Sequence, residues 1–163
     1  MANKTTELIF LEIYYLYKVN MNHERKGGKM NDFLCPKCKD HLRVGDHLIF
    51  KVKNVAKQSA LILLSPQIGN YTSMKHPSFE IKEGESLDFY CPLCGASLKS
   101  DIHDNLALVL MQDEKGEKYA VYFSQIAGEH STYKTTGDAV HMEGEDAGRY
   151  TYFKVGDKFK KYF

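Results

Sequence analysis

The sequence predicts an all-β protein with little helix, and three observations support this fold class. The chain of 163 residues contains 11 tyrosines and 9 phenylalanines, and aromatic residues at this density are typical of β-rich cores. Short apolar or alternating runs are separated by polar loops that contain glycine, which is the pattern of strands joined by turns. No internal segment keeps a helical period, although one short turn of helix fits residues 124–128.

In the first half of the chain, four short runs have the composition of strands: residues 47–52, 60–64, 79–81 and 87–90. The first two are joined by a polar connection and are expected to form a hairpin. The last two flank Glu83-Gly84-Glu85, which predicts a second hairpin.

The second half repeats this pattern with runs at residues 106–111, 119–123, 139–142 and 149–153. The loop Asp113–Gly116 separates the first two runs, and a glycine-containing loop between β-prone runs is a strong hairpin signal. The turn Glu143-Gly144-Glu145 separates the other two runs. The sequence therefore predicts a second pair of hairpins.

All four cysteines belong to two Cys-Pro-x-Cys motifs, Cys35–Cys38 and Cys91–Cys94. Each motif is a tight turn that directs two sulfur atoms toward one point, and two such turns supply the ligands of a tetrahedral metal site. Disulfides within each pair are the alternative, but cytoplasmic thiols stay reduced. We therefore predict one four-cysteine site with Cys35, Cys38, Cys91 and Cys94 as its metal ligands.

These paired turns resemble those of zinc-ribbon proteins, and the turns alone are similar to those of rubredoxins. The resemblance is confined to the two short motifs and implies the four cysteines as ligands. The first turn departs from the zinc-ribbon pattern because Lys39 stands where the second turn has Gly95. Zinc is expected over iron on ligand softness and geometry. A closed zinc site of four thiolates is structural, since it has no open coordination position.

The chain also repeats itself. Residues 35–42 match residues 91–98, residues 64–75 match residues 123–134 with a one-residue slip near Pro66, and residues 81–85 match residues 141–145, so the offset increases along the chain. We interpret this as a tandem duplication with halves at residues 30–90 and 91–153. Each half would contain one Cys-Pro-x-Cys turn, called a knuckle below, followed by a β-meander. An approximate twofold between the halves would place both knuckles at its axis. Chance similarity is the alternative.

Both ends of the chain have unusual composition. Residues 8–19 are apolar but too short to span a membrane, and the codons of Lys26-Gly27-Gly28 can contain a bacterial ribosome-binding sequence just before Met30. We therefore expect residues 1–29 to be an untranslated leader and Met30 to be the true start. The alternative is an amphipathic helix at residues 7–17 that docks on the domain or on a membrane surface. Residues 154–163 form a basic tail.

Other candidate chemistry is weaker. Glu129-His130-Ser131-Thr132 could place a base beside a nucleophile, and His103 or His141 could contribute to a second site. No phosphate-binding loop or dinucleotide motif is present. A polar loop is the simpler interpretation of this cluster, because nothing in the sequence supplies the geometric partners that catalysis requires. We predict no catalytic residues.

Together these observations predict a cytoplasmic bacterial zinc protein that acts as a non-enzymatic interaction module, with another protein as its partner. The first alternative is a nucleic-acid-binding zinc ribbon that assists transcription or translation. The acidic second half disfavours it, because residues 91–153 carry ten acidic and five basic side chains. The second alternative is an enzyme with a site around Glu129–Thr132. The third is a redox switch that releases zinc when its thiolates are oxidised.

Overall fold

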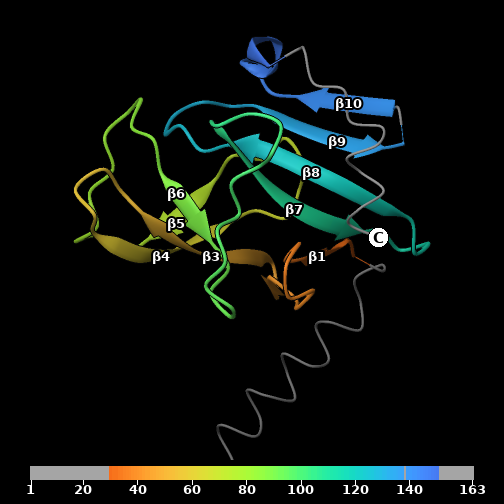
Figure 1. Ribbon diagram of the computed structural model, residues 1–163, viewed down its shortest axis with the longest axis horizontal. Helices are drawn as coiled ribbons and strands as arrows, with labels where there is room; N and C mark the ends of the chain where they lie inside the picture. Colours follow the sequence, from red (N-terminus) through yellow and green to blue (C-terminus); the bar gives the residue numbers. More distant parts are fainter. Residues whose placement is uncertain (1–29, 138, 151–163) are drawn as a thin grey trace, which may run out of the picture. The chain divides into compact units, whose positions relative to one another are not determined.

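The computed structural model describes residues 30–137 and 139–150. The predicted leader, residues 1–29, and the basic tail, residues 154–163, lie outside the described residues. The described part contains ten strands and one 3-10 turn, η1 (Ala147–Arg149), so the prediction of an all-β fold is confirmed (Figure 1). Within this part of the chain, no helix is long and apolar enough to cross a membrane.

The strands form two five-stranded antiparallel sheets (Figure 1). The first sheet has the order β2-β3-β4-β5, with β6 also paired to β3; its strands are β2 (Arg43–Val44), β3 (His47–Lys53), β4 (Ser59–Leu64), β5 (Ser73–Lys75) and β6 (Asp88–Tyr90). The second sheet has the order β1-β7-β8-β9-β10; its strands are β1 (Asp32–Leu34), β7 (Leu106–Gln112), β8 (Lys118–Ser124), β9 (Thr132–Thr136) and β10 (Ala139–Glu143).

Each knuckle directly follows a short strand, and these two strands belong to different sheets. Strand β1 directly precedes the first knuckle but pairs with β7, whereas β6 directly precedes the second knuckle and pairs with β3. The registers match: Phe33 lies opposite Met111, and Phe89 lies opposite Val52. Each knuckle therefore follows a strand that belongs to the sheet built mainly from the other half of the chain.

The strand registers of the two sheets match when one half is shifted onto the other by a single constant offset. Leu48 pairs with Leu64, and the equivalent residues Ala107 and Phe123 also pair. At the opposite end of the same hairpins, Lys53 pairs with Ser59 and Gln112 with Lys118. The predicted hairpins β3–β4 and β7–β8 are confirmed, and they are built alike. The duplication itself stays a prediction.

The loops that follow these hairpins also share one conformation. Gln67 N–H donates to Ser65 Oγ at 3.2 Å, and Ile126 N–H donates to Ser124 Oγ at 3.0 Å. Gly69 and Gly128 have φ angles of 85° and 84°. Since these pairs keep the offset of the hairpins, the one-residue slip expected near Pro66 is not needed. The helical turn expected at residues 124–128 is wrong, because these residues form a turn stabilised by the serine.

The main hydrophobic core is formed by buried side chains from both sheets. Phe50 and Phe89 pack edge to face with ring centroids 5.6 Å apart, and Phe123 lies 5.2 Å from Phe89. Strand β7 is buried on both faces: Ala107 and Val109 face this core, whereas Leu106 and Leu108 belong to a second cluster; its other members are Ala120, Tyr122, Tyr133, Ala147 and Tyr150. Burial of apolar area from both sheets stabilises their union.

One predicted strand is wrong, and another lies mostly outside the described residues. Residues 79–81 form no strand: Phe79 is buried, but its carbonyl accepts from Lys75 Nζ and the Glu80 carbonyl accepts from Asn54 Nδ2. Side chains thus replace a partner strand there, and β6 pairs with β3 instead of forming the expected hairpin. Residues 149–153 were expected as a strand after Glu143-Gly144-Glu145, but Arg149 ends η1; residues 151–153 lie outside the described part.

A substitution at Gly144 tests the close contact between the turn after β10 and the loops that contain Tyr71 and His130. Its φ is 102°, and a Cβ at this position would overlap the His130 carbonyl oxygen and Tyr71 Oη. Because a backbone atom cannot move aside cheaply, Gly144→Ala is expected to lower the free energy of unfolding by more than about 3 kcal/mol. Gly45→Ala is the control, since Gly45 also has a positive φ but has open space around it; it should cost only about 1 kcal/mol. Equal effects in urea denaturation would contradict the steric argument.

Candidate metal centre

The two Cys-Pro-x-Cys turns have the same backbone hydrogen bonds. Lys39 N–H donates to the Cys35 carbonyl at 3.0 Å, and Gly95 N–H donates to the Cys91 carbonyl at 3.0 Å. In the reverse direction, the Cys35 N–H donates to the Asp40 carbonyl at 3.0 Å and the Cys91 N–H donates to the Ala96 carbonyl at 2.9 Å. The backbone hydrogen bonds within each turn therefore fix its conformation without a contribution from a metal ion.

The residue after the second cysteine is left-handed in both turns. Gly95 has φ 72°, as its sequence predicts, and Lys39 has φ 64° despite its side chain. An L-residue in this region is strained by about 1 kcal/mol or more. The geometry of the knuckle therefore imposes the conformation, and the first turn accepts strain to keep it.

Short strands and buried leucines hold the turns in place. Leu42 N–H donates to the Phe33 carbonyl at 2.8 Å, and Leu98 N–H donates to the Phe89 carbonyl at 2.9 Å. These four side chains are at most 4% exposed. Each turn is thus anchored on both sides in the core, so the directions of its sulfur atoms are set by the fold.

The structure brings the four predicted ligands together. All four Sγ atoms lie within 4.8 Å of one another, and the Cys35–Cys94 and Cys38–Cys91 Sγ distances are both 3.9 Å. A tetrahedron with metal–sulfur bonds of about 2.3 Å has edges of about 3.8 Å. The cluster can therefore hold a metal ion, and its two equal distances exchange when the halves are exchanged, as an approximate twofold requires.

The environment of the sulfurs is uneven. Cys35 and Cys91 are fully buried, Cys38 is partly buried and Cys94 is exposed. Burial raises the pKa of the Cys35 thiol, whereas the Ala96 N–H lowers the pKa of Cys94. At Cys38 the Asp40 N–H lowers the pKa, but burial together with the Cys94 and Cys35 sulfurs outweighs it and raises the pKa to about 12.

In these pKa shifts, the ionisation of one cysteine affects the ionisation of its neighbours. Four thiolates at this spacing repel each other, so protons or a cation must neutralise them. Main-chain N–H groups give partial relief, since the Lys37 N–H points at Cys35 Sγ from 3.3 Å. A divalent ion would displace the protons and bind all four sulfurs, leaving no position open for water. Such a centre would stabilise the fold and would not catalyse a reaction.

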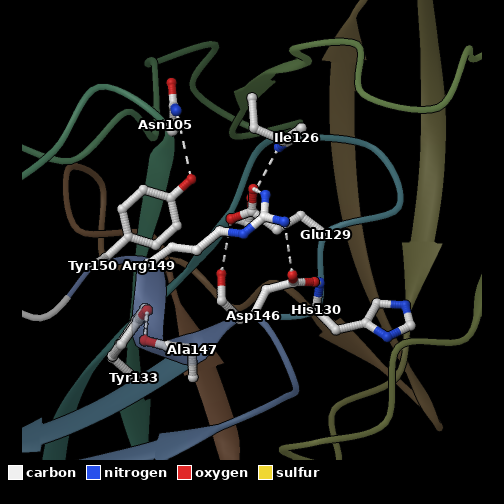
Figure 2. Close-up of polar contacts among 11 residues, drawn as sticks. Asn105, Ile126, Glu129, His130, Tyr133, Asp146, Ala147, Arg149 and Tyr150 are labelled. Atoms are coloured by element: carbon white, nitrogen blue, oxygen red, sulfur yellow. Dashed lines mark hydrogen bonds and ion pairs between the residues drawn. The ribbon is translucent and has the colours of Figure 1, made fainter.

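Polar contacts of Glu129 and His130 tie the loop that contains Glu129-His130-Ser131-Thr132 to Asp146 and Arg149 (Figure 2). The Glu129 carboxylate is largely buried, lies 3.3 Å from Arg149 Nη1 and accepts from Ser131 Oγ at 3.2 Å. Ser131 Oγ therefore bonds to the glutamate and not to His130. Asp146 links the same loop to η1, because it accepts from the His130 N–H at 2.9 Å and pairs with Arg149 at 3.1 Å (Figure 2).

The histidines proposed for a second site lie apart. His103 Nδ1 accepts from the Asn105 N–H at 3.0 Å, and its ring packs against Tyr150. His141 pairs with Glu143 at 2.8 Å on exposed β10. Within residues 30–137 and 139–150, the four cysteines form the one group of three or more His, Cys, Asp or Glu side chains with metal-binding spacing.

Sequence reasoning did not identify Tyr71 as a functional candidate. Its ring stacks on the His130 ring, with centroids 4.4 Å apart and planes 7° from parallel. Tyr71 Oη also donates to the Glu143 carbonyl at 2.9 Å. Tyr71 and His130 occupy equivalent positions in the two halves, so the match between residues 64–75 and 123–134 was the available signal. What the sequence could not show is that the two loops meet.

Comparisons with protein-family models, with curated proteins and with solved structures give no match for this chain.

The strained residue in the first knuckle gives a matched pair of variants. Lys39→Gly should raise the free energy of unfolding of the metal-loaded protein by about 0.5–1 kcal/mol, because it removes left-handed strain. Gly95→Lys should lower it by about 1 kcal/mol, because it introduces the same strain. Chemical denaturation measures both, and the double exchange should restore the starting stability. Destabilisation by Lys39→Gly would show that Lys39 contributes more through its side chain than its backbone costs.

Proposed function

We propose that this protein binds one structural zinc ion through Cys35, Cys38, Cys91 and Cys94 and acts in the cytoplasm as a non-enzymatic interaction module. The convergence of the four sulfurs within 4.8 Å carries this proposal. Zinc is favoured over iron because it suits a closed tetrahedral thiolate site and has no redox chemistry that would disturb a structural role. The reduced state of cytoplasmic thiols keeps such a site available.

The pairing of the strands that precede the knuckles gives the proposed metal ion a mechanical role. Each knuckle is attached to a strand in the opposite sheet, so an ion between the knuckles would clamp β1 and β6 into place together. The knuckles are distant in the sequence, so the link would also restrict the unfolded chain. Matching registers at one offset further support a tandem duplication.

Metal content and chelation test the structural role. The purified protein should contain one equivalent of zinc and be colourless. Stripping the metal with a strong chelator should lower the thermal unfolding midpoint by more than about 10 °C, since structural zinc supplies folding free energy. A variant with all four cysteines changed to serine is the control and should not respond to the chelator. A stripped protein that unfolds at its original temperature would exclude a structural ion.

For the partner, we propose another protein that adds a strand to β10. This strand ends its sheet and pairs with β9 alone among the described strands. Val140 is 41% exposed and Met142 is 50% exposed, and these two side chains share one face of the strand, whereas His141 points to the other face. Edge strands are commonly protected by lysine or proline, and Ala139–Glu143 contains neither. An exposed apolar edge of this kind fits recognition by β-strand addition.

Site-specific cross-linking tests this edge. A photoreactive amino acid at His141 should capture a protein partner in cells, whereas the same residue at exposed Val55 on the other sheet's hairpin should not. Val140→Lys combined with Met142→Lys should abolish capture from position 141 without changing zinc content, because the charges disfavour strand addition. Identical products from positions 141 and 55, or capture that survives both lysines, would contradict the proposal.

A further inference from the structure

A cavity of about 530 Å³ lies between the two loops that follow the β3–β4 and β7–β8 hairpins. The first loop lines it with Ser65 to Ser73 and the second with Ser124 to Thr132. Its inner wall is formed by side chains of both sheets, among them Phe50, Phe89 and Phe123. Protein sites for small molecules have volumes of about 300–1,000 Å³ and mostly apolar walls. The cavity has both properties.

Contacts between the halves fix the positions of the loops around this cavity. The stacked rings of Tyr71 and His130 join one loop to the other, and both residues line the cavity. The Gly84 N–H donates to the Ala127 carbonyl at 2.8 Å, and the Ala127 N–H donates to the Glu85 carbonyl at 2.8 Å. The space is therefore bounded by segments that are hydrogen-bonded or stacked, so the site is preformed.

The polar groups in the lining are largely engaged within the protein. Gln125 is 3% exposed; its Oε1 accepts from the Phe89 N–H and its Nε2 donates to the Asp104 carbonyl. Glu129 is held by Arg149 and Ser131 (Figure 2). Water inside such a cavity would find few hydrogen-bond partners. An apolar occupant suits these walls better than water or a strongly polar ligand does.

The charges of the lining restrict the occupant further. Among the described residues that line the cavity, two are carboxylates and one is an ammonium: Glu83, Glu129 and Lys75. The Lys75 ammonium already donates to the Phe79 carbonyl at 2.5 Å. An anionic ligand would lose its hydration without gaining an available cation, because Lys75 donates to the Phe79 carbonyl and Arg149 pairs with Glu129. An uncharged ligand avoids this cost.

We propose that this cavity binds a small, uncharged and mostly apolar molecule between the two loops. This goes beyond the proposed function, because it requires neither the zinc ion at the knuckles nor a protein at β10 to contact the ligand. The recurrence of the loops explains the placement, since each half contributes one wall. Leu64 and Phe123 occupy equivalent wall positions, as do Ile68 and Ala127, so the two walls have the same backbone but different shapes.

Two fluorescent probes of similar ring structure test the site in the full-length, zinc-loaded protein. N-Phenyl-1-naphthylamine is uncharged and should bind one molecule per chain with a blue-shifted emission and a micromolar Kd. 1-Anilinonaphthalene-8-sulfonate carries one negative charge and should bind at least tenfold more weakly, since the nearby cations Lys75 and Arg149 are already engaged. Absence of binding by the uncharged probe, or equal affinity for the two probes, would overturn the proposal.

Substitutions that copy one wall onto the other locate the binding. Leu64→Phe with Ala127→Ile places in each loop the residue that the equivalent position already carries, so the backbone accommodates both. The added volume should weaken binding of N-phenyl-1-naphthylamine at least tenfold. Val44→Phe is the control, because Val44 is exposed and does not line the cavity. Zinc content and unfolding temperature are measured for all variants.

Three outcomes are decisive. Weaker probe binding in the double variant alone, with zinc content and unfolding temperature unchanged, supports the cavity. Unchanged binding in the double variant, or equal weakening by Val44→Phe, would overturn it. If the photoreactive residue at position 141 captures no protein in an otherwise unchanged chain that binds the probe, the proposed partner is refuted and the ligand site stands.

Discussion

The convergence of four sulfurs at one point is the constraint on which the rest of the structure depends. Each knuckle follows a short strand that is paired in the sheet of the other half, β1 with β7 and β6 with β3. The two turns can therefore meet only when both sheets are assembled. Repulsion between closely spaced thiolates opposes that meeting, and a cation bound between them would turn this repulsion into a net attraction. Folding and the binding of a metal ion at these sulfurs would therefore be coupled.

The elements that were predicted correctly are those whose signal in the sequence is local. The hairpins β3–β4 and β7–β8 have long apolar runs on both sides of a tight turn, and the knuckles are defined by four consecutive residues. Strands β1, β2, β5 and β9 were missed because they have two to five residues and are stabilised by distant partners. Phe79–Ile81 failed for the opposite reason: its apolar residues are needed in the core, but side chains of Lys75 and Asn54 satisfy its backbone.

The candidate site shows the same division. The composition of the two turns was enough to nominate all four cysteines, since each turn orients its own sulfurs. The polar cluster at Glu129 suggested catalysis because its residues are adjacent in sequence. In the structure, the side chains of Glu129 and Ser131 bond to each other, and His130 turns to Tyr71 from the other half. Adjacency in sequence therefore gave no information about which side chains would meet.

The differences between matching positions of the two loops are informative because the backbone is the same at both. Tyr71 and His130 occupy equivalent positions, and their rings stack on each other. Two histidines in these places would repel each other whenever both were protonated, whereas a tyrosine and a histidine do not. Glu83 lies against Gly128, and Glu143 lies against Gly69, so each Glu-Gly-Glu turn covers a loop of the other half. Only the second turn continues into η1, where Asp146 and Arg149 fix the second loop. A symmetric frame with one reinforced loop produces a cavity with two unlike walls, and unlike walls can hold an asymmetric ligand in one orientation.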